Sequence, residues 1–344
     1  MTDERRRLVI FGAATLVVAV LLLWLAPQVV LLSFAAVLVA VFLSGPTRLL
    51  VRYTPLSTRL ALAVVALVLV GISALAFTLL GPNLVSQVVT FSEQLPASLE
   101  RIRAQLSEQE WGRTVLSIMP QPEDLAGRAT QLVGGLTRVV TSTIGVLTSG
   151  LVIALVGLYL AAAPDLYHHA VITLIPVKKR DRGAEILAAL SRALGWWLVG
   201  RMTSMAVVGM LTLIGLLIIG VPLAVTLALI AALLSFIPNL GPVISAVPAV
   251  IIAFAQSPRD GLWVIALYIA IQTVESYAIT PLIERKAVDL LPAFLLIMQI
   301  LFGVLFGLFG LVLASPLAVA LTVLIQMIYV QDALQDDVHV LGSR

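Results

Sequence analysis

The chain has 344 residues, of which 60% are hydrophobic and only 11% are charged, and its formal net charge is +3. A soluble domain carries about 25% charged residues, so this composition excludes an ordinary soluble protein. The chain has no cysteine, which excludes disulfides, iron–sulfur clusters and thiolate zinc sites. Long, nearly uncharged runs recur from end to end and predict an all-α polytopic membrane protein.

Hydropathy predicts about eight membrane segments. In chain order, the uninterrupted segments are 8–25, 29–43, 60–80, 145–163, 196–219 and 262–279. The first follows three arginines, as a signal peptide would, but it has no small-residue cleavage site, so we interpret it as a retained span. Two further stretches, 222–255 and 293–330, are apolar but are broken by proline and glycine.

The stretch 222–255 carries the motif FIPNLGP, with Pro238, Asn239, Gly241 and Pro242 at its centre. Proline removes a backbone donor and disfavours helical geometry in the preceding residue. We therefore expect two half-helices of about 15 residues, each shorter than the roughly 30 Å hydrocarbon core. A proline-kinked single span is the alternative, but two prolines with an Asn and a Gly favour a true break. Such breaks mark substrate sites in transporters.

The stretch 293–330 is also longer than one span needs. Its interruptions are Gly303, Gly307, Gly310 and the pair Ser315–Pro316, and we expect its bend near Gly310–Pro316. Two re-entrant or discontinuous elements of opposite orientation would resemble the inverted repeats of secondary transporters. This symmetry rests on the interruptions alone, because no sequence repeat is visible.

Lysines and arginines predict the orientation. They cluster at 5–7, 48–59 and 178–192, and all three clusters fall on one side if both termini are cytoplasmic. This orientation describes a multi-pass protein with both termini in the cytoplasm; the resemblance described below implies that the membrane is a bacterial cytoplasmic (inner) membrane. The expected domains are a three-span bundle at 1–80, an external amphipathic helical segment at 81–144, a transport core at 145–330 and a cytoplasmic tail at 331–344.

The external segment has a helical stripe of apolar residues. Its members are Leu84, Val88, Phe91, Leu95, Leu99, Ile102 and Leu106. The stripe could pack on the protein's own bundle, lie on the membrane surface or form a subunit interface. The last of these would make the protein a homo-oligomer.

Two charged side chains, Arg201 and Glu275, lie well inside predicted spans, where charge is costly and usually functional. Their similar depth makes an ion pair possible, although Arg201 could instead extend to the interface. Gln272 shares a helix face with Glu275, and Ser276 lies on a neighbouring face. Asn239 and Gln299 offer neutral hydrogen-bonding groups near the bends, although Asn239 could simply satisfy the bent backbone.

The stretch 200–249, which includes FIPNLGP, resembles the AI-2E (autoinducer-2 exporter) family, the PerM-like permeases. The stretches QTVESYAITPLIERKAVDLLP and GLFGLVLASPLAVAL carry the same resemblance. The matching motif residues are Gly200, Pro238, Gly241, Pro242, Gln272, Glu275, Pro281, Pro292, Gly307, Gly310 and Pro316. The resemblance implies an inner-membrane transporter, often homo-oligomeric, associated with export of the quorum-sensing signal autoinducer-2 and in some members with sodium/proton exchange. Many members have Gln at the position of Arg201 and Asn at that of Ser276, and both departures touch the polar cluster.

The function expected from the sequence is export of a small polar solute, such as an autoinducer-2-like signal, coupled to a proton or sodium gradient. A sodium/proton antiporter, a passive channel-like permease and a membrane scaffold are the alternatives. No enzyme motif, cofactor site or nucleic-acid partner is expected. The candidate substrate and ion pathway comprises Arg201, Pro238, Asn239, Gly241, Pro242, Gln272, Glu275, Ser276, Gln299, Gly310 and Pro316.

Overall fold

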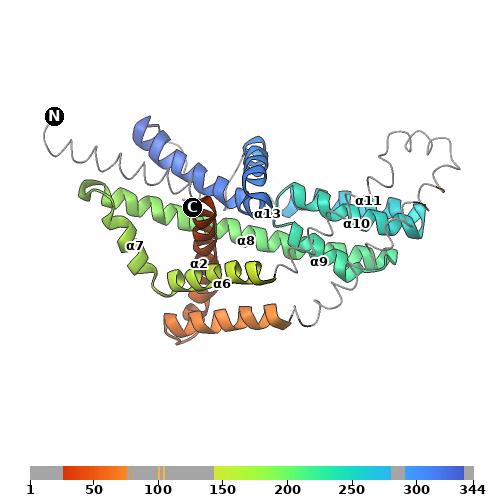
Figure 1. Cartoon of the computed structure of the whole chain (residues 1–344), viewed down its shortest axis with the longest axis horizontal. Helices are drawn as coiled ribbons and strands as arrows, with labels where there is room; N and C mark the ends of the chain where they lie inside the picture. The colour runs from red at the N-terminus through yellow and green to blue at the C-terminus, as the bar shows by residue number, and fades with distance from the viewer. Residues whose placement is uncertain are drawn as a thin grey trace.

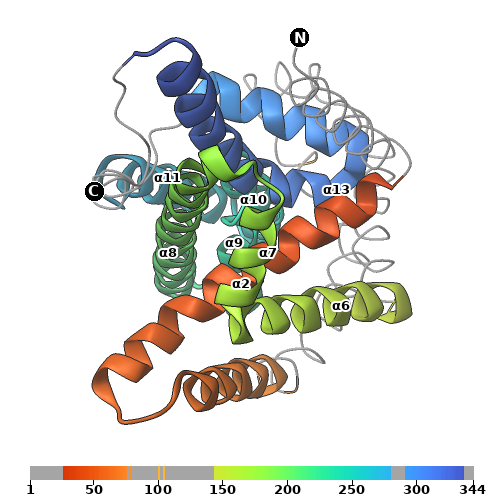
Figure 2. The ribbon, with the colours of Figure 1, turned by 90° about the vertical axis from the view of Figure 1, so that its left-hand side faces the viewer.

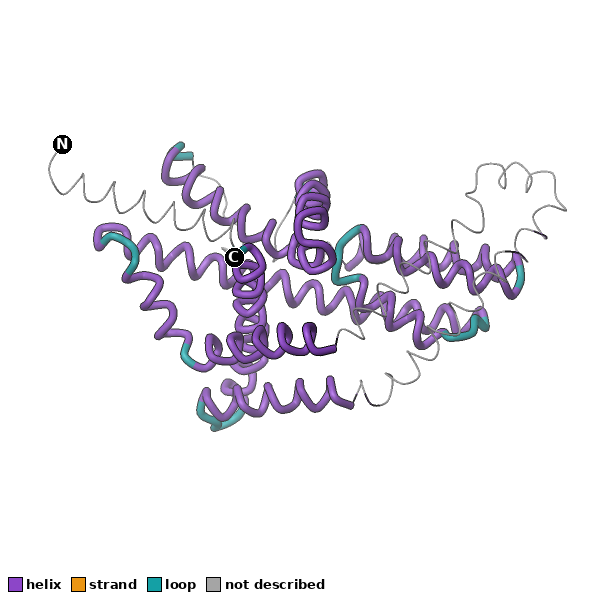
Figure 3. Tube along the Cα trace, viewed as in Figure 1, coloured by secondary structure: helices purple, strands orange, loops and turns teal. Residues whose placement is uncertain are grey.

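The structure is a computed structural model that describes residues 26–75, 78, 100, 104, 143–279 and 291–336. Within these ranges every regular element is a helix, and short loops connect them (Figures 1 and 3). The all-α expectation is therefore confirmed for this part of the chain. The first predicted span and nearly all of the external segment, with its apolar stripe, lie outside the described residues.

Four helical stretches are long and apolar enough to cross a membrane: Pro27–Tyr53, Thr58–Leu75, Val177–Ile219 and Pro292–Ala333. A fifth candidate is the pair Thr148–Ala162 and Pro164–Thr173, which is bent by 88°. Many large apolar side chains on these helices are exposed, including Leu67 at 71% and Val304 at 81%. Such side chains suit a lipid environment, and the chain is a multi-pass membrane protein. The described residues therefore contain four or five candidate spans, fewer than the eight segments expected from the whole sequence.

The N-terminal helices pack on one another. Helix α2 (Pro27–Tyr53) contacts α6 (Thr143–Ala162) and, with helix Thr58–Leu75, encloses a small core around Leu43, Leu62 and Val65. Helix α6 ends at Ala162, just before the proline that the sequence marks as a stop, and α7 (Pro164–Thr173) follows. Pro164 is the first residue of α7, where its missing N–H costs nothing.

Helix α8 (Arg180–Ile219) follows the short turn η1 (Val177–Lys179) and has 40 residues. The helix contains the predicted span 196–219 and extends beyond it on the N-terminal side. The additional part is helical because its buried face, with Ala189, Ala193 and Leu194, packs against the C-terminal part of the chain. Helix stability in proteins comes mainly from such packing, which hydropathy does not detect.

The predicted break in 222–255 is confirmed. Helix α9 (Ala224–Leu234) ends before Pro238, and α10 (Leu240–Gln256) begins after Asn239. Helices α8, α9, α10 and α11 (Pro258–Val274) lie antiparallel in succession (Figure 1). Their common core includes Leu216, Leu227, Ala249 and Val264.

The second broken element is bent, but not where the sequence predicted. Helix α13 (Pro292–Leu324) changes direction at Gly307, which has φ 63° and ψ −148°. This region of backbone geometry is open almost only to glycine. Gly307 divides α13 into a first arm before it and a second arm after it. Pro316 is buried inside the second arm, which is a continuous helix, so the predicted bend near Gly310–Pro316 is wrong. The bend lies at Gly307 because one residue with positive φ turns the chain, whereas the packing around Pro316 keeps its helix intact.

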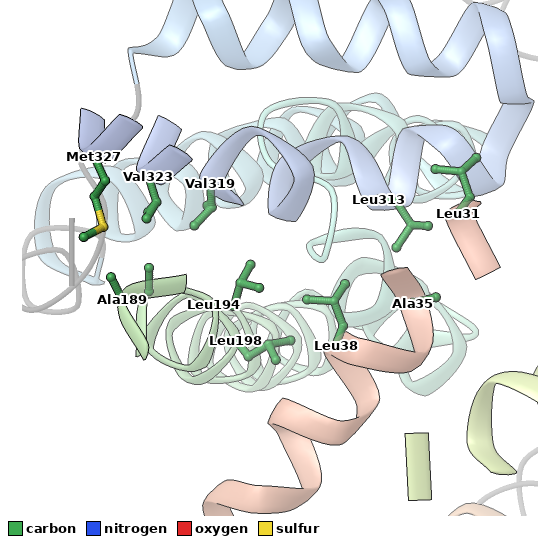
Figure 4. Packing of buried hydrophobic residues seen from close by; sticks show 11 residues of the cluster. Leu31, Ala35, Leu38, Ala189, Leu194, Leu198, Leu313, Val319, Val323 and Met327 are labelled. Carbon is green, nitrogen blue, oxygen red and sulfur yellow. The ribbon is translucent and has the colours of Figure 1, made fainter. Parts of the chain in front are cut away.

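The second arm of α13 runs along the N-terminal half of α8, where α2 also crosses (Figure 2). Val319 and Val323 face Leu194 in the largest core cluster, as Figure 4 shows. The helix continues as η3 (Ile325–Ala333). There Arg182 of α8 binds the carbonyl of Met327 at 3.1 Å, the side chain of Gln331 at 2.8 Å and Asp332 at 2.9 Å.

Candidate substrate and ion site

The two intramembrane charges are paired where α8 runs beside the C-terminal end of α11. An Nη1 of Arg201 lies 3.4 Å from Oε1 of Glu275, and the hydroxyl of Ser204 donates a short hydrogen bond to the same oxygen. The side chain of Arg201 is 14% exposed and that of Glu275 is 9% exposed. The ion pair considered from the sequence is therefore present. Ser204 was missed, although it lies three residues after Arg201 and hence on the same helix face.

Glu275 occupies a special backbone position. Helix α11 ends at Val274, and Glu275 begins η2 (Glu275–Ile279), a π-helical turn. Single π-helical turns within α-helices are frequent at functional sites, because they rotate a side chain away from its regular direction. Gln272, on the last turn of α11, donates to the hydroxyl of Ser276 at 3.4 Å. These two predicted site residues therefore lie together beside Glu275.

The second oxygen of Glu275, Oε2, is buried and has no hydrogen-bond partner within the described part of the chain. Buried polar atoms without partners are uncommon in native proteins. Oε1 is held by Arg201 and Ser204, so the carboxylate is oriented and still has one oxygen able to accept a proton or a cation. Ser204 and Arg201 thus orient the carboxylate through Oε1 and leave Oε2 without a hydrogen-bond partner among the described residues.

The polar cluster lies beside the break between α9 and α10. The rings of Trp197, one turn before Arg201, and Phe236, in the break, are 5.5 Å apart and almost perpendicular. On the other side of the cluster, Val208 of α8 packs with Ala231 of α9 and Ile271 of α11. Because α8 and α9 are antiparallel, these contacts place Arg201 and Ser204 level with the last turn of α9.

A second polar contact joins the two broken elements. The side-chain amide of Gln299, in the first arm of α13, donates to the carbonyl of Pro238 at 2.9 Å. Gln299 is fully buried, and its Oε1 has no partner within the described residues. The same carbonyl accepts the backbone N–H of Leu240 at 2.7 Å, so Gln299 is its second donor. In the sequence, Asn239 was considered for satisfying the bent backbone, and the structure shows Gln299 contributing to it.

The remaining residues of the break shape its turn. Asn239 is exposed, and its φ of 64° and ψ of −50° form a γ-turn in which the Leu240 N–H donates to the Pro238 carbonyl at 2.7 Å, a rare and strained geometry. Gly241 lies so close to α9 that an added Cβ would collide with the carbonyl oxygen of Leu234. Pro242 follows within the first turn of α10. The motif therefore makes a tight helical hairpin.

Gly310 and Pro316 belong to the second broken element. An added Cβ at Gly310 would collide with the carbonyl oxygen of Phe302, so this glycine lets the two arms of α13 approach beside the bend. Pro316 and Ser315 are buried in the second arm, and the Ser315 hydroxyl has no partner among the described residues. Gly310 therefore shapes the second element, and Gln299 contacts the first through the carbonyl of Pro238.

The described residues contain no group of three or more His, Asp or Glu side chains placed to hold a metal ion. The chemistry that this site offers is therefore that of one buried carboxylate, one guanidinium and several neutral polar groups. Such a set can bind a polar solute or a monovalent cation between helices.

A protein-family comparison covers nearly the whole chain. The family model described as "AI-2E family transporter" matches residues 13–329. The chain belongs to the AI-2E transporter family. The resemblance inferred from the motifs is thus confirmed, and with it the assignment to a family of membrane transporters.

Curated members of the AI-2E family are distant but similar in extent. The chain is 26% identical over 288 residues to "Putative transport protein YueF" of Bacillus subtilis, covering 80% of this chain and 78% of that protein. It is 25% identical over 295 residues to "Putative transport protein sll0060" of Synechocystis, covering 82% and 83%. A shorter match of 103 residues, 35% identical, is to "Putative transport protein MT0215" of Mycobacterium tuberculosis, covering 30% and 28%.

Proposed function

We propose that this AI-2E family member is a secondary transporter that exports a small polar solute, such as an autoinducer-2-like signal, driven by a proton or sodium gradient. It would act in a bacterial inner membrane with both termini in the cytoplasm. The observation that carries the proposal is the carboxylate of Glu275. One oxygen is held by Arg201 and Ser204, and the other is buried without a partner in the described structure.

Charge inside a membrane protein is costly and is retained mainly at ion and substrate pathways. A proton or cation on Oε2 would weaken the pull of Glu275 on Arg201, so binding there can loosen the contact between α8 and α11. The neighbouring break in α9–α10 supports coupling of this change to access. The break contacts α8 through Phe236 and α13 through Pro238. A shift of α8 is thereby linked to both broken elements.

The test is transport by purified protein in liposomes. Counterflow with a panel of signal furanones and small organic acids identifies the solute, and imposed proton or sodium gradients identify the coupling ion. Glu275→Gln keeps the shape of the side chain but removes its charge and its ability to bind a proton. We expect loss of gradient-driven transport, with passive exchange retained. Glu185→Gln is the matched control, because Glu185 is an exposed glutamate on α8.

Stability separates coupling from a structural role. If Glu275 only balances Arg201, Glu275→Gln removes one partner of a buried ion pair, which costs about 3–5 kcal/mol. The double variant Glu275→Gln/Arg201→Gln should then restore stability and transport together. Full gradient-driven transport in the single variant would exclude the coupling role. Flux that continues after both gradients are collapsed would indicate a passive permease, and sodium/proton exchange without solute would indicate an antiporter.

A further inference from the structure

A cavity of about 450 Å³ lies between α2 and α8, on residues outside the pathway described above. Its α2 wall includes Val41, Phe42 and Arg48, and its α8 wall includes Arg192, Trp196 and Met202. The helices meet beside it, where Gly195 lies against Val41. The volume falls within the range of sites for small molecules.

The lining combines two arginines with an apolar wall. Arg48 and Arg192 are 144 positions apart in the sequence but contribute to the same cavity, and both are exposed at its rim. Leu198, Val199 and Met202 make the wall apolar. No acidic residue occurs among the described residues that line the cavity. The described lining therefore brings two basic side chains and an apolar wall together, a combination that suits an anionic amphiphile.

Trp196 indicates the depth at which the cavity lies in the membrane. Its ring is 37% exposed and lines the same cavity. Tryptophan is enriched at the level of lipid headgroups, and basic residues beside it attract anionic lipids. Arg48 and Arg192 also belong to two of the basic clusters that the sequence places on one side of the membrane.

We propose that this cavity binds one anionic phospholipid, with the phosphate between Arg48 and Arg192 and an acyl chain along Leu198, Val199 and Met202. Arginine recognises phosphate through several N–H donors at once. The lipid would join α2 to α8, and α8 also carries Arg201 and Ser204. Bound lipid therefore holds the N-terminal helices against the helix that carries the polar cluster.

The test is native mass spectrometry of the purified full chain with phosphatidylglycerol and with phosphatidylcholine of the same acyl chains. We expect the wild type to prefer phosphatidylglycerol. Arg48→Gln/Arg192→Gln should weaken its binding by about twenty-five-fold, since each basic side chain near an anionic headgroup contributes about fivefold. Arg52→Gln/Arg59→Gln removes two neighbouring arginines that do not line the cavity and should keep the preference. Equal loss in both double variants, or none in the first, would overturn the proposal.

Three further measurements identify the occupant. Met202→Trp fills the space along the apolar wall without changing either arginine and should lower phosphatidylglycerol binding. Unchanged binding would contradict the proposal. This variant also tests the proposal if the variant lacking both arginines does not fold. Inorganic phosphate should not displace the lipid. Displacement by millimolar phosphate would assign the site to a free anion. A changed subunit number in Arg48→Gln/Arg192→Gln, with lipid binding intact, would assign the cavity to a subunit contact.

Discussion

The two broken elements reach similar shapes by different means. Between α9 and α10 the chain turns over residues 235–239, with Pro238 at the turn and Asn239 at φ 64°. In α13 the direction changes at the single residue Gly307, at φ 63°. Both turns therefore contain a residue with positive φ, and only one of them contains a proline. Backbone freedom at one position, more than the presence of proline, decides where an apolar helix turns.

Prolines inside the helices support this comparison. Pro46 lies within α2, Pro248 within α10 and Pro316 within the second arm of α13, and each of these helices continues past its proline. Neighbouring helices and local adjustments can satisfy the freed carbonyl in a membrane protein.

The comparison leads to four predictions. Each is tested by measuring the free energy of unfolding in detergent, by titration with sodium dodecyl sulfate.

The largest effect is expected for Gly241→Ala. The added Cβ would collide with the backbone carbonyl of Leu234, which cannot move without separating α9 from α10. Overpacking of this kind costs about 3 kcal/mol. Gly303→Ala is the control, because its nearest contact would be Leu311 Cδ1 at an ordinary 3.6 Å. Equal stability of the two variants would show that the hairpin is not closely packed at this point.

The next effect is expected for Gly307→Ala. The space around a new Cβ is open within the described structure, so the cost is conformational and amounts to about 2 kcal/mol. Gly150→Ala is a matched control, because it also meets open space but lies in regular helix. There alanine should be neutral or should stabilise the helix by about 0.5–1 kcal/mol. If Gly307→Ala behaved like Gly150→Ala, the bend would not be at Gly307.

A smaller effect is expected for Gln299→Met. The substitution removes the hydrogen bond to Pro238 but also removes a buried, unpaired Oε1, so the net loss should be about 1 kcal/mol. Gln256→Met provides the comparison, because this exposed glutamine donates to the carbonyl of Gly220 at 3.3 Å and should contribute less. Identical losses would remove the argument that Gln299 joins the two broken elements.

The smallest effect is expected for Pro316→Ala. The helix already continues through this position, so alanine regains a backbone donor while losing part of a buried ring. The two terms oppose one another, and stability should change by less than about 1 kcal/mol. A loss of several kcal/mol, well beyond that of Pro248→Ala in α10, would show that Pro316 does help to set the bend.

The sequence predicted the charged residues of the candidate site, but not the neutral residues that form hydrogen bonds there. Arg201 and Glu275 are visible as charges in apolar runs, and FIPNLGP marks a break because proline acts on the residues next to it. Ser204 was missed although it shares a helix face with Arg201, and the contact between Gln299 and Pro238 could not be foreseen, because neutral polar residues are common in membrane helices. The external stripe from Leu84 to Leu106 lies outside the described residues, and its role in a homo-oligomer stays a prediction.

By itself the sequence determined the helical membrane class, the family, the hairpin at 235–242 and the two charges inside the spans. These properties follow from composition, hydropathy and backbone restrictions, which act locally. Only the tertiary structure decided that α8 begins at Arg180, that α13 turns at Gly307 and that Glu275 meets Arg201 and Ser204. These outcomes depend on which helix faces pack together, and packing between segments distant in sequence is not encoded in any single stretch of it.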